Sequence, residues 1–355
     1  MAELFLEILN MSIRASWVLL IVLALRLLLR KGPAWFPMTL WVVAAVRFVC
    51  PFSITSSISL IPSVQTVDTG IMTAPQPVIN SGIPIIDQTI NPVILDVFSP
   101  AVDTGINPLQ FWVCFSAWIW LLGIVLLLGY MSISYLRLHR RVRDAAFHAS
   151  CIYLSNKIRS PFVLGILKPK IYLPNEMAEA DKEYVLSHEL THIRRLDHWW
   201  KPIGFLILSL HWFNPLVWLA YILLCRDIEA GCDKAVIKNF SPAQRADYAQ
   251  ALLNCCAEHN RISACPIAFG EISVKERVKN VLNYKHPTFW LISIAAIVCI
   301  AAACCLLTNP HSAAAPTDPF SAESTPTEPS FPGETTDTTP AEPNEGPYGL
   351  PTPQV

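Results

Sequence analysis

Residues 107–135 have the sequence NPLQFWVCFSAWIWLLGIVLLLGYMSISY, which contains no Asp, Glu, Lys or Arg. A helix needs about 20 mainly apolar residues to cross the hydrocarbon core of a bilayer. This stretch exceeds that length, and residues 288–308 form a second uncharged apolar run. Both runs predict membrane-spanning helices, so the chain is expected to be an α-helical membrane protein.

The overall composition supports this class. Of the 355 residues, 53% are hydrophobic and only 15% are charged, whereas soluble domains carry about 25% charged residues. An ordinary soluble globular protein is therefore excluded. Direct nucleic-acid binding is also disfavoured, because the formal net charge is −1 and the sequence has no basic stripe.

Two further apolar runs lie near the N-terminus, at about residues 9–29 and at residues 34–50. Only a short basic break separates them, so together they predict a helical hairpin. A cleaved signal peptide is the alternative for the first run, but the residues before it include Glu3 and Glu7 and no basic residue. We therefore predict four spans.

Lys and Arg residues are unevenly distributed along the chain. All but five of the 26 lie within residues 137–287, and none lies in residues 57–106 or 309–355. Positive charge marks the cytosolic side of a membrane protein. The central block is therefore expected in the cytosol, and the other two segments, with both chain termini, are expected outside.

Residues 185–193, VLSHELTHI, contain a metalloprotease motif. His188 and His192 are four residues apart on a predicted helix, so both imidazoles face one side and can hold one zinc ion. Glu189 lies next to the first histidine, where it can take a proton from a zinc-bound water that attacks a peptide carbonyl. Chance produces this motif in roughly one chain of this length per hundred.

A catalytic zinc ion also needs a third protein ligand and an open fourth position. Glu229 is the strongest candidate, while a Cys232 thiolate would favour a closed structural site. Asp233, one helical turn beyond Glu229, could hydrogen-bond the second nitrogen of a zinc histidine. The alternative for this acidic cluster is a solvated helix face. Three side chains could donate to the oxyanion, and spacing does not choose among them: Arg194, His198 and Tyr248.

Residues 202–225 carry no charge apart from His211, and alone they would score as another span. A single crossing would put Glu229 on the opposite side of the membrane from the two histidines. However, the sequence WFNP at residues 212–215 divides the run into two halves that are too short to span. We therefore predict a helical hairpin, buried in the domain or dipping into the inner leaflet, that holds the active site against the membrane.

Residues 160–174, SPFVLGILKPKIYLP, predict two short strands joined at Lys168 and Pro169. Such a strand can pair with the backbone of a peptide substrate, and a purely structural hairpin is the alternative. The expected organisation has six parts. They are a transmembrane helical hairpin (1–56), an extracellular loop (57–106), a third transmembrane helix (107–136), a cytosolic α+β, zincin-like zinc metalloprotease domain (137–287), a fourth transmembrane helix (288–308) and a disordered, Pro- and Thr-rich extracellular tail (309–355).

The chain resembles the BlaR/MecR-type membrane zinc metallopeptidases, the antirepressor signal transducers of bacterial beta-lactam resistance. The resemblance covers about residues 1–308. It rests on the span order and on the motifs SPF and KPKIYLP within residues 160–174, HELTH at 188–192, HWFNP at 211–215 and EAGCD at 229–233. It implies zinc ligands at His188, His192 and Glu229, and Glu189 as the catalytic base. It also implies a bacterial plasma-membrane protein whose protease domain acts, directly or through a cascade, on a winged-helix repressor.

The resemblance ends outside the membrane. The transducers carry a penicillin-binding sensor domain with a Ser-x-x-Lys motif after the last span, whereas residues 309–355 contain no Lys. Acylation by a beta-lactam is therefore not expected, and the signal would enter through the outside loop or a separate sensor. The leading function is a zinc endopeptidase that relays an outside signal by cleaving a cytosolic regulator. The alternatives are a membrane quality-control protease and a non-catalytic scaffold, and a second copy of the chain is a further candidate partner.

Overall fold

The computed structural model describes residues 1–50, 54–55, 66–67, 71, 78–81, 84–98, 108–257 and 274–309. The tail expected beyond residue 309 and much of the loop expected at residues 57–106 lie outside the described residues. The chain divides into the units Met1–Ser312 and Ala313–Val355. Every element described below belongs to the first unit.

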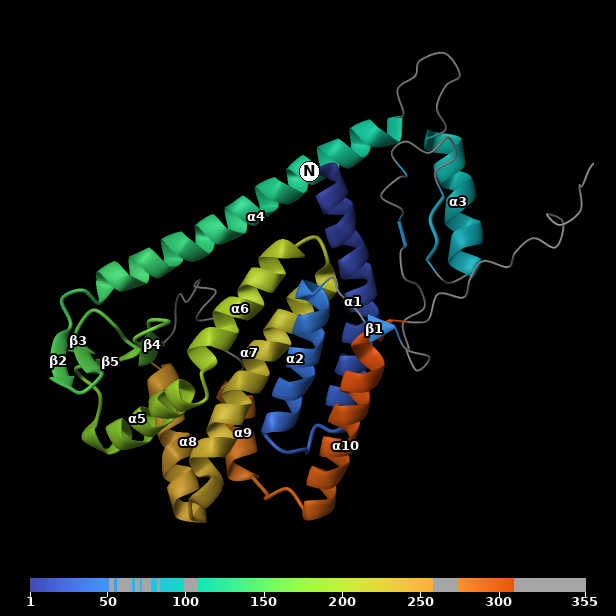
Figure 1. Ribbon diagram of the computed structural model, residues 1–355. Coiled ribbons are helices and arrows are strands. Elements are labelled where there is room, and N and C mark those ends of the chain that lie inside the picture. The colour runs from blue at the N-terminus through green and yellow to red at the C-terminus, as the bar shows by residue number, and fades with distance from the viewer. Residues whose placement is uncertain are drawn as a thin grey trace, which may run out of the picture. The chain divides into compact units, whose positions relative to one another are not determined.

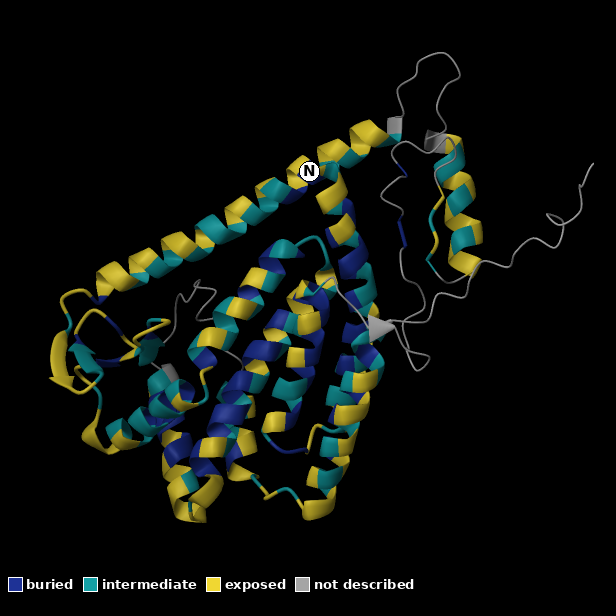
Figure 2. Cartoon of the chain, viewed as in Figure 1, coloured by how far each residue is buried: buried dark blue, intermediate teal, exposed yellow. Residues whose placement is uncertain are grey.

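Five helices lie side by side as a bundle in Figure 1: α1 (Ala2–Leu28), α2 (Trp35–Val49), α6 (Asp197–Leu210), α7 (Pro215–Val236) and α10 (Phe289–Leu306). One apolar cluster joins them, with contributions such as Leu19, Leu40, Leu208, Ile228 and Ala295. In Figure 2 the bundle helices carry buried residues along much of their length. The outward faces are also rich in large apolar side chains, as a lipid environment requires.

Three described helices are long and apolar enough to cross a membrane: α1, α4 (Pro108–Arg141) and α10. The fourth expected span corresponds to α2, which has only 15 residues. At 1.5 Å per residue this helix is about 22 Å long, against about 30 Å of hydrocarbon. The described chain is thus mostly helical, with three candidate spans and one shorter apolar helix.

The long helix α4 diverges from the bundle in Figure 1 and meets it at the turn between α6 and α7. The indole of Trp120 donates to the Leu210 carbonyl at 2.9 Å, and the indole of Trp212 donates to the Trp120 carbonyl at 3.1 Å. Gly123 permits this approach, since a Cβ there would lie 2.3 Å from the Trp212 ring. The sequence WFNP therefore fixes the position of α4 as well as the turn.

Helices α6 and α7 form a hairpin whose turn contacts α1 and the end of α2. Asn214 caps α7 by accepting from the Leu216 amide at 3.0 Å, and it donates to the hydroxyls of Ser12 and Ser16 at 2.9 and 2.8 Å. The structure contains the expected hairpin, and its depth in a membrane stays a prediction. The hairpin runs along the bundle helices, because its apolar faces match those of α1, α2 and α10.

The elements of residues 146–282 outside the bundle form a small α+β layer. A four-stranded sheet has the order β2-β3-β5-β4, in which β5 is parallel to β3 and antiparallel to β4. Helix α5 packs on it through a cluster that includes Ile171, Leu173 and Val185. The elements are β2 (Ala146–Ala149), β3 (Ile152–Ser155), β4 (Phe162–Leu164), β5 (Lys170–Pro174), α5 (Glu179–Arg194), η2 (Ile237–Asn239), α8 (Pro242–Ala257) and α9 (Val274–Leu282).

The two strands predicted in residues 160–174 are β4 and β5, which pair as expected, with β4 at the sheet edge. Gly165 lies in the connection with φ 110°, and a Cβ there would lie 2.6 Å from the Lys168 carbonyl oxygen. This conformation favours glycine. The turn therefore depends on that residue.

Several contacts gather the segments between spans at one end of the bundle. Asn10 of α1 holds Val67 by two hydrogen bonds of 2.6 and 2.9 Å. Strand β1 (Ile54–Thr55), which follows α2, pairs in parallel with β6 (Thr308–Asn309), which follows α10. Another short helix of this region, α3, covers Pro84–Phe98. The start of α1 and the ends of α2 and α10 thus share one end of the bundle.

Candidate metal centre

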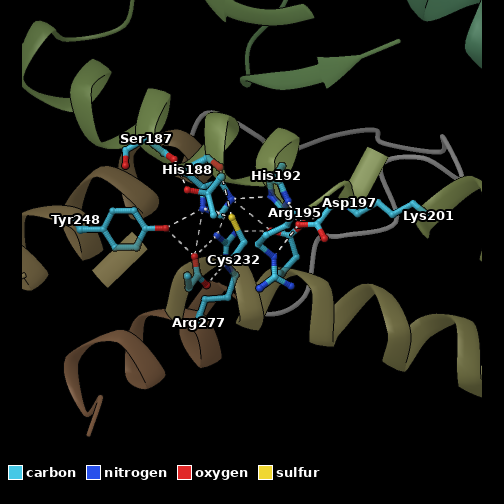
Figure 3. Close-up of polar contacts among 12 residues, drawn as sticks. Ser187, His188, His192, Arg195, Asp197, Lys201, Cys232, Tyr248 and Arg277 are labelled. Atoms are coloured by element: carbon cyan, nitrogen blue, oxygen red, sulfur yellow. Dashed lines mark hydrogen bonds and ion pairs between the residues drawn. The ribbon is translucent and has the colours of Figure 1, made fainter. Parts of the chain in front are cut away.

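Helix α5 presents two histidines on one buried face, as their four-residue spacing predicts. The Nε2 atoms of His188 and His192 lie 3.0 Å apart, and both residues are buried. Figure 3 shows the two side chains side by side. Glu189, between them in sequence, is also buried.

The carboxylate of Glu229 on α7 reaches the same point. Its Oε2 lies 3.6 Å from Nε2 of His188, and its Oε1 lies 3.7 Å from Nε2 of His192. Neighbouring ligand atoms of a tetrahedral zinc ion, with bonds of about 2.0–2.1 Å, are separated by about 3.3 Å. The three observed separations, 3.0, 3.6 and 3.7 Å, lie around that value. The donor set therefore fits a zinc ion.

Cys232 also belongs to this cluster. Its Sγ and one nitrogen from each histidine all lie within 4.8 Å of one another. Its thiol donates to the His188 carbonyl at 3.4 Å and lies 3.5 Å from Nδ1 of the same residue, and the Tyr248 hydroxyl lies 2.8 Å from that nitrogen. Proximity alone thus leaves two ligand sets, one completed by Glu229 and one by Cys232.

An aspartate that the sequence analysis missed supports His192. Oδ2 of Asp197 lies 2.8 Å from Nδ1 of His192 and accepts a hydrogen bond from Arg195 at 3.2 Å. The chain turns back after α5 because Leu196 adopts φ 59°, a left-handed conformation that costs a non-glycine residue about 1–2 kcal/mol. Asp197 fixes the orientation of the imidazole, so that Nε2 points at Glu229.

The other histidine, His188, is supported by a tyrosine. Tyr248 on α8 donates to Oδ1 of Asp233 at 2.7 Å, and its hydroxyl oxygen lies 2.8 Å from Nδ1 of His188. The predicted partner Asp233 is itself 3.5 Å from that nitrogen. Asp233 therefore acts mainly through Tyr248, whose hydroxyl lies on the Nδ1 side of the ring.

The other two oxyanion candidates occupy different surroundings. Arg194 is exposed on α5. His198 is half-buried near the β4–β5 connection, where it contacts the backbone of Ile166, and burial lowers its pKa.

Two cations near the carboxylates were also missed by the sequence analysis. Arg277 on α9 donates to both oxygens of Asp233 at 2.7 and 2.8 Å, and its Nη1 lies 3.4 Å from Oε2 of Glu229. Lys201 on α6 donates to Oε1 of Glu229 at 2.9 Å. Arg277 is 89 positions from His188, and no spacing rule relates Lys201 to the motif.

The electrostatics keep the carboxylates ionised despite burial. Burial raises the pKa of Glu229, but the charges of Lys201, His192 and Arg277 outweigh it and hold the pKa well below its usual range. In Asp233, burial is likewise outweighed by Arg277, so its pKa is also lowered. The cluster therefore offers a cation preformed negative charge.

A protein-family model matches the part of the chain that contains this cluster. The family model described as BlaR1 peptidase M56 matches residues 6–281, a range that contains the metal cluster and all its supporting residues. The chain belongs to the BlaR1 peptidase M56 family.

Individual relatives match a shorter part of this M56 chain. It is 30% identical over 145 residues to the methicillin resistance mecR1 protein of Staphylococcus aureus, which is 39% of the chain and 25% of the relative. It is 31% identical over 169 residues to the regulatory protein BlaR1 of Bacillus licheniformis, 45% of the chain and 28% of the relative. The match therefore spans only about a quarter of each relative's length. M56 membership makes the chain a member of a metallopeptidase family, in which a buried metal cluster is expected.

Proposed function

We propose that this M56 chain is a zinc-dependent endopeptidase of a bacterial plasma membrane that hydrolyses peptide bonds of a cytosolic regulatory protein. The observation that carries this proposal is the convergence of Nε2 of His188, Nε2 of His192 and the carboxylate of Glu229, with separations of 3.0 to 3.7 Å. Three such ligands leave one tetrahedral position open, which a catalytic zinc site needs.

Glu229 is the third ligand in this proposal because of which ring nitrogens it approaches. Both Nε2 atoms lie within 3.7 Å of its oxygens. The Cys232 thiol contacts Nδ1 of His188, a nitrogen that lies 2.8 Å from the Tyr248 hydroxyl. Coordination through that nitrogen would break the Tyr248 contact, whereas coordination through Nε2 preserves it.

Glu189 is the proposed catalytic base. It follows His188 directly on α5 and is buried. When bound, a zinc ion supplies a Lewis acid that polarises the peptide carbonyl and makes a water molecule more acidic. The Glu189 carboxylate then accepts the proton of the attacking water and delivers it to the leaving amine nitrogen. The edge strand β4, next to α5, offers its free side to the substrate backbone.

The membrane arrangement we propose has four spans, formed by α1, α2, α4 and α10, around the α6–α7 hairpin. The start of α1 and the β1–β6 pair lie at one bundle end, which we assign to the outside. The basic residues cluster toward the zincin-like domain at 137–287, which we assign to the cytosol. The short α2 is partly covered by the hairpin, which packs against it in the same apolar cluster.

The substrate class follows from the family resemblance and the side on which the site lies. The names of the relatives refer to regulation and to methicillin resistance, and for this chain we propose a winged-helix repressor as the cleaved protein. A sensor outside the cell, and pairing with a second copy, would provide the input. A membrane quality-control protease is the second candidate, favoured only by the position of the site beside spanning helices.

Mapping of new protein N-termini tests the proposal. Cells expressing the parent chain are compared with cells expressing Glu189→Gln, each with and without cell-envelope stress. We expect a small set of fragments that require Glu189 and include a DNA-binding repressor. Many unrelated membrane-protein fragments would instead favour quality control, and identical N-termini under every condition would contradict a protease function.

A further inference from the structure

A partly buried ion pair links α7 to the hairpin of α1 and α2. The Arg26 guanidinium on α1 donates to both oxygens of Asp227, through Nε and Nη2, each at 2.7 Å. The indole of Trp41 on α2 donates to Oδ2 of the same carboxylate at 2.8 Å. The exposed fractions of the Arg26 and Asp227 side chains are only 20% and 10%. A single carboxylate thus joins three helices.

A second contact repeats this link two turns further along. Lys234 on α7 donates to the carbonyl of Gly32, in the connection between α1 and α2, at 3.4 Å. Residues 227 and 234 are seven positions apart, so they lie on the same face of an α-helix. The α1–α2 hairpin therefore holds one face of α7 at two points.

The metal cluster occupies the other side of the same helical turns. Glu229 follows Asp227 by two residues, which rotates it by about 200° around the helix axis. Glu229 and Asp233 accordingly face α5, α8 and α9. A rotation or shift of α7 at Asp227 would therefore move the Glu229 carboxylate relative to the histidines of α5.

A third contact connects the same hairpin to α9. Arg30, at the end of α1, lies 3.4 Å from Glu276, which precedes Arg277 in the sequence. This pair is much more exposed than the Arg26–Asp227 pair, with 73% and 46% of the two side chains accessible. Since exposed ion pairs contribute little, it provides a natural control for the buried one.

We infer that Asp227, held by Arg26 and Trp41, is a positioning residue for the metal centre. It fixes the height and rotation of α7, so that Glu229 meets the two histidines at one point. The first two membrane helices are then part of the metal-binding structure, although none of their residues touches the metal cluster. This inference rests on the proposed function, because it takes Glu229 as a zinc ligand.

The test measures zinc affinity in full-length protein reconstituted in lipid nanodiscs, by competition with a chromophoric chelator. Asp227→Asn and Arg26→Gln are each expected to weaken zinc binding by about tenfold, as for other residues that orient metal ligands. Arg26→Lys should recover part of the affinity. The matched exposed variant Arg30→Gln should stay within about twofold of the parent.

A double-variant comparison separates positioning from general damage. If both residues act through their ion pair, Arg26→Gln combined with Asp227→Asn should lose no more zinc affinity than either single change. If Asp227→Asn does not accumulate, Trp41→Phe removes one donor, keeps the ring, and should weaken binding by about threefold. Thermal unfolding of the metal-free variants is measured in parallel.

Two results would overturn the inference. One is parent-like zinc affinity in Asp227→Asn or, where that variant is missing, in Trp41→Phe. The other is an affinity loss that merely matches the fraction of unfolded protein. The proposed function fails separately, because it requires Glu229→Ala to lose zinc. Loss of zinc in Glu229→Ala with parent-like binding in Asp227→Asn would refute only the role of Asp227.

Discussion

Helices α5 and α7 supply the metal cluster in different ways. On α5, His188 and His192 meet because they are one turn apart on a single helix, and their Nε2 atoms are 3.0 Å apart. On α7, Glu229 reaches them only after the chain has formed the whole α6–α7 hairpin against the membrane helices. Local spacing determines the first half of the site, and the packing of the bundle determines the second.

This difference predicts that changes in the two helices affect different properties of the site. The α5 half contains the proposed base and two ligands, and changes there should alter the reaction directly. The α7 half holds its ligand through distant contacts, so changes there should alter metal affinity first. The predictions below test this separation, beginning with the largest expected effect.

The largest effect is expected on α5. Glu189→Gln should lower peptide cleavage by about 10²–10⁴-fold, since it removes the proton acceptor. Bound zinc, measured by atomic emission on the purified protein, should remain at the parent level because Glu189 is not a ligand. Parent-like cleavage by this variant would remove Glu189 from the mechanism, and a loss of zinc would make it a ligand.

A smaller but still large effect is expected on α7. Glu229→Ala should weaken zinc binding by about 100-fold or more, because one of the three proposed ligands is lost and Lys201 loses its carboxylate partner. The control is Cys232→Ser, whose zinc affinity should stay within about threefold of that of the parent. If Cys232→Ser loses more zinc affinity than Glu229→Ala, the thiol and not the carboxylate completes the site.

The features that the sequence predicted are those set by local spacing, and the features that it missed are those set by packing. The histidine pair and the two strands β4 and β5 follow from local patterns and have the expected arrangement. A single crossing would have placed Glu229 on the opposite side of the membrane from the histidines, so the chain was predicted to reverse within this run. It does reverse, at residues 211–214. The packing partners of the hairpin were not predictable, because they depend on complementary apolar faces in α1, α2 and α10.

The supporting polar residues escaped prediction for two reasons. Arg277 and Asp233 are 44 positions apart, and no periodicity relates them. Asp197 is close in sequence to His192, but it reaches the ring only because Leu196 adopts a left-handed conformation that its side chain does not favour. Tyr248 was considered only as one of three oxyanion candidates, and its contact with Nδ1 of His188 was not predicted, because that contact depends on the packing of α8.

The support of His192 offers a test within α5 itself. Asp197→Asn keeps the size of the side chain but removes the charge that orients the imidazole, and it should weaken zinc binding by about 10–100-fold. The expected loss is smaller than that of Glu229→Ala, because all three ligands remain. The control is Arg195→Gln, which leaves the 2.8 Å contact between Asp197 and His192 in place. Equal losses in the two variants would show that Arg195, not the aspartate, sets the ring.

The smallest effect on the site is expected at the far end of the hairpin. Asn214→Ala removes the cap of α7 and two hydrogen bonds to α1. Loss of an N-cap costs about 0.5–2 kcal/mol, so the protein should unfold at a lower temperature in nanodiscs. Zinc affinity should change by less than about threefold, because α7 remains fixed at its other end by Asp227. The double variant Ser12→Ala with Ser16→Ala keeps the cap, so it should lose less stability. A zinc loss in Asn214→Ala as large as that in Asp227→Asn would mean that the hairpin moves as one rigid unit, with no separate fixing of its metal-bearing end.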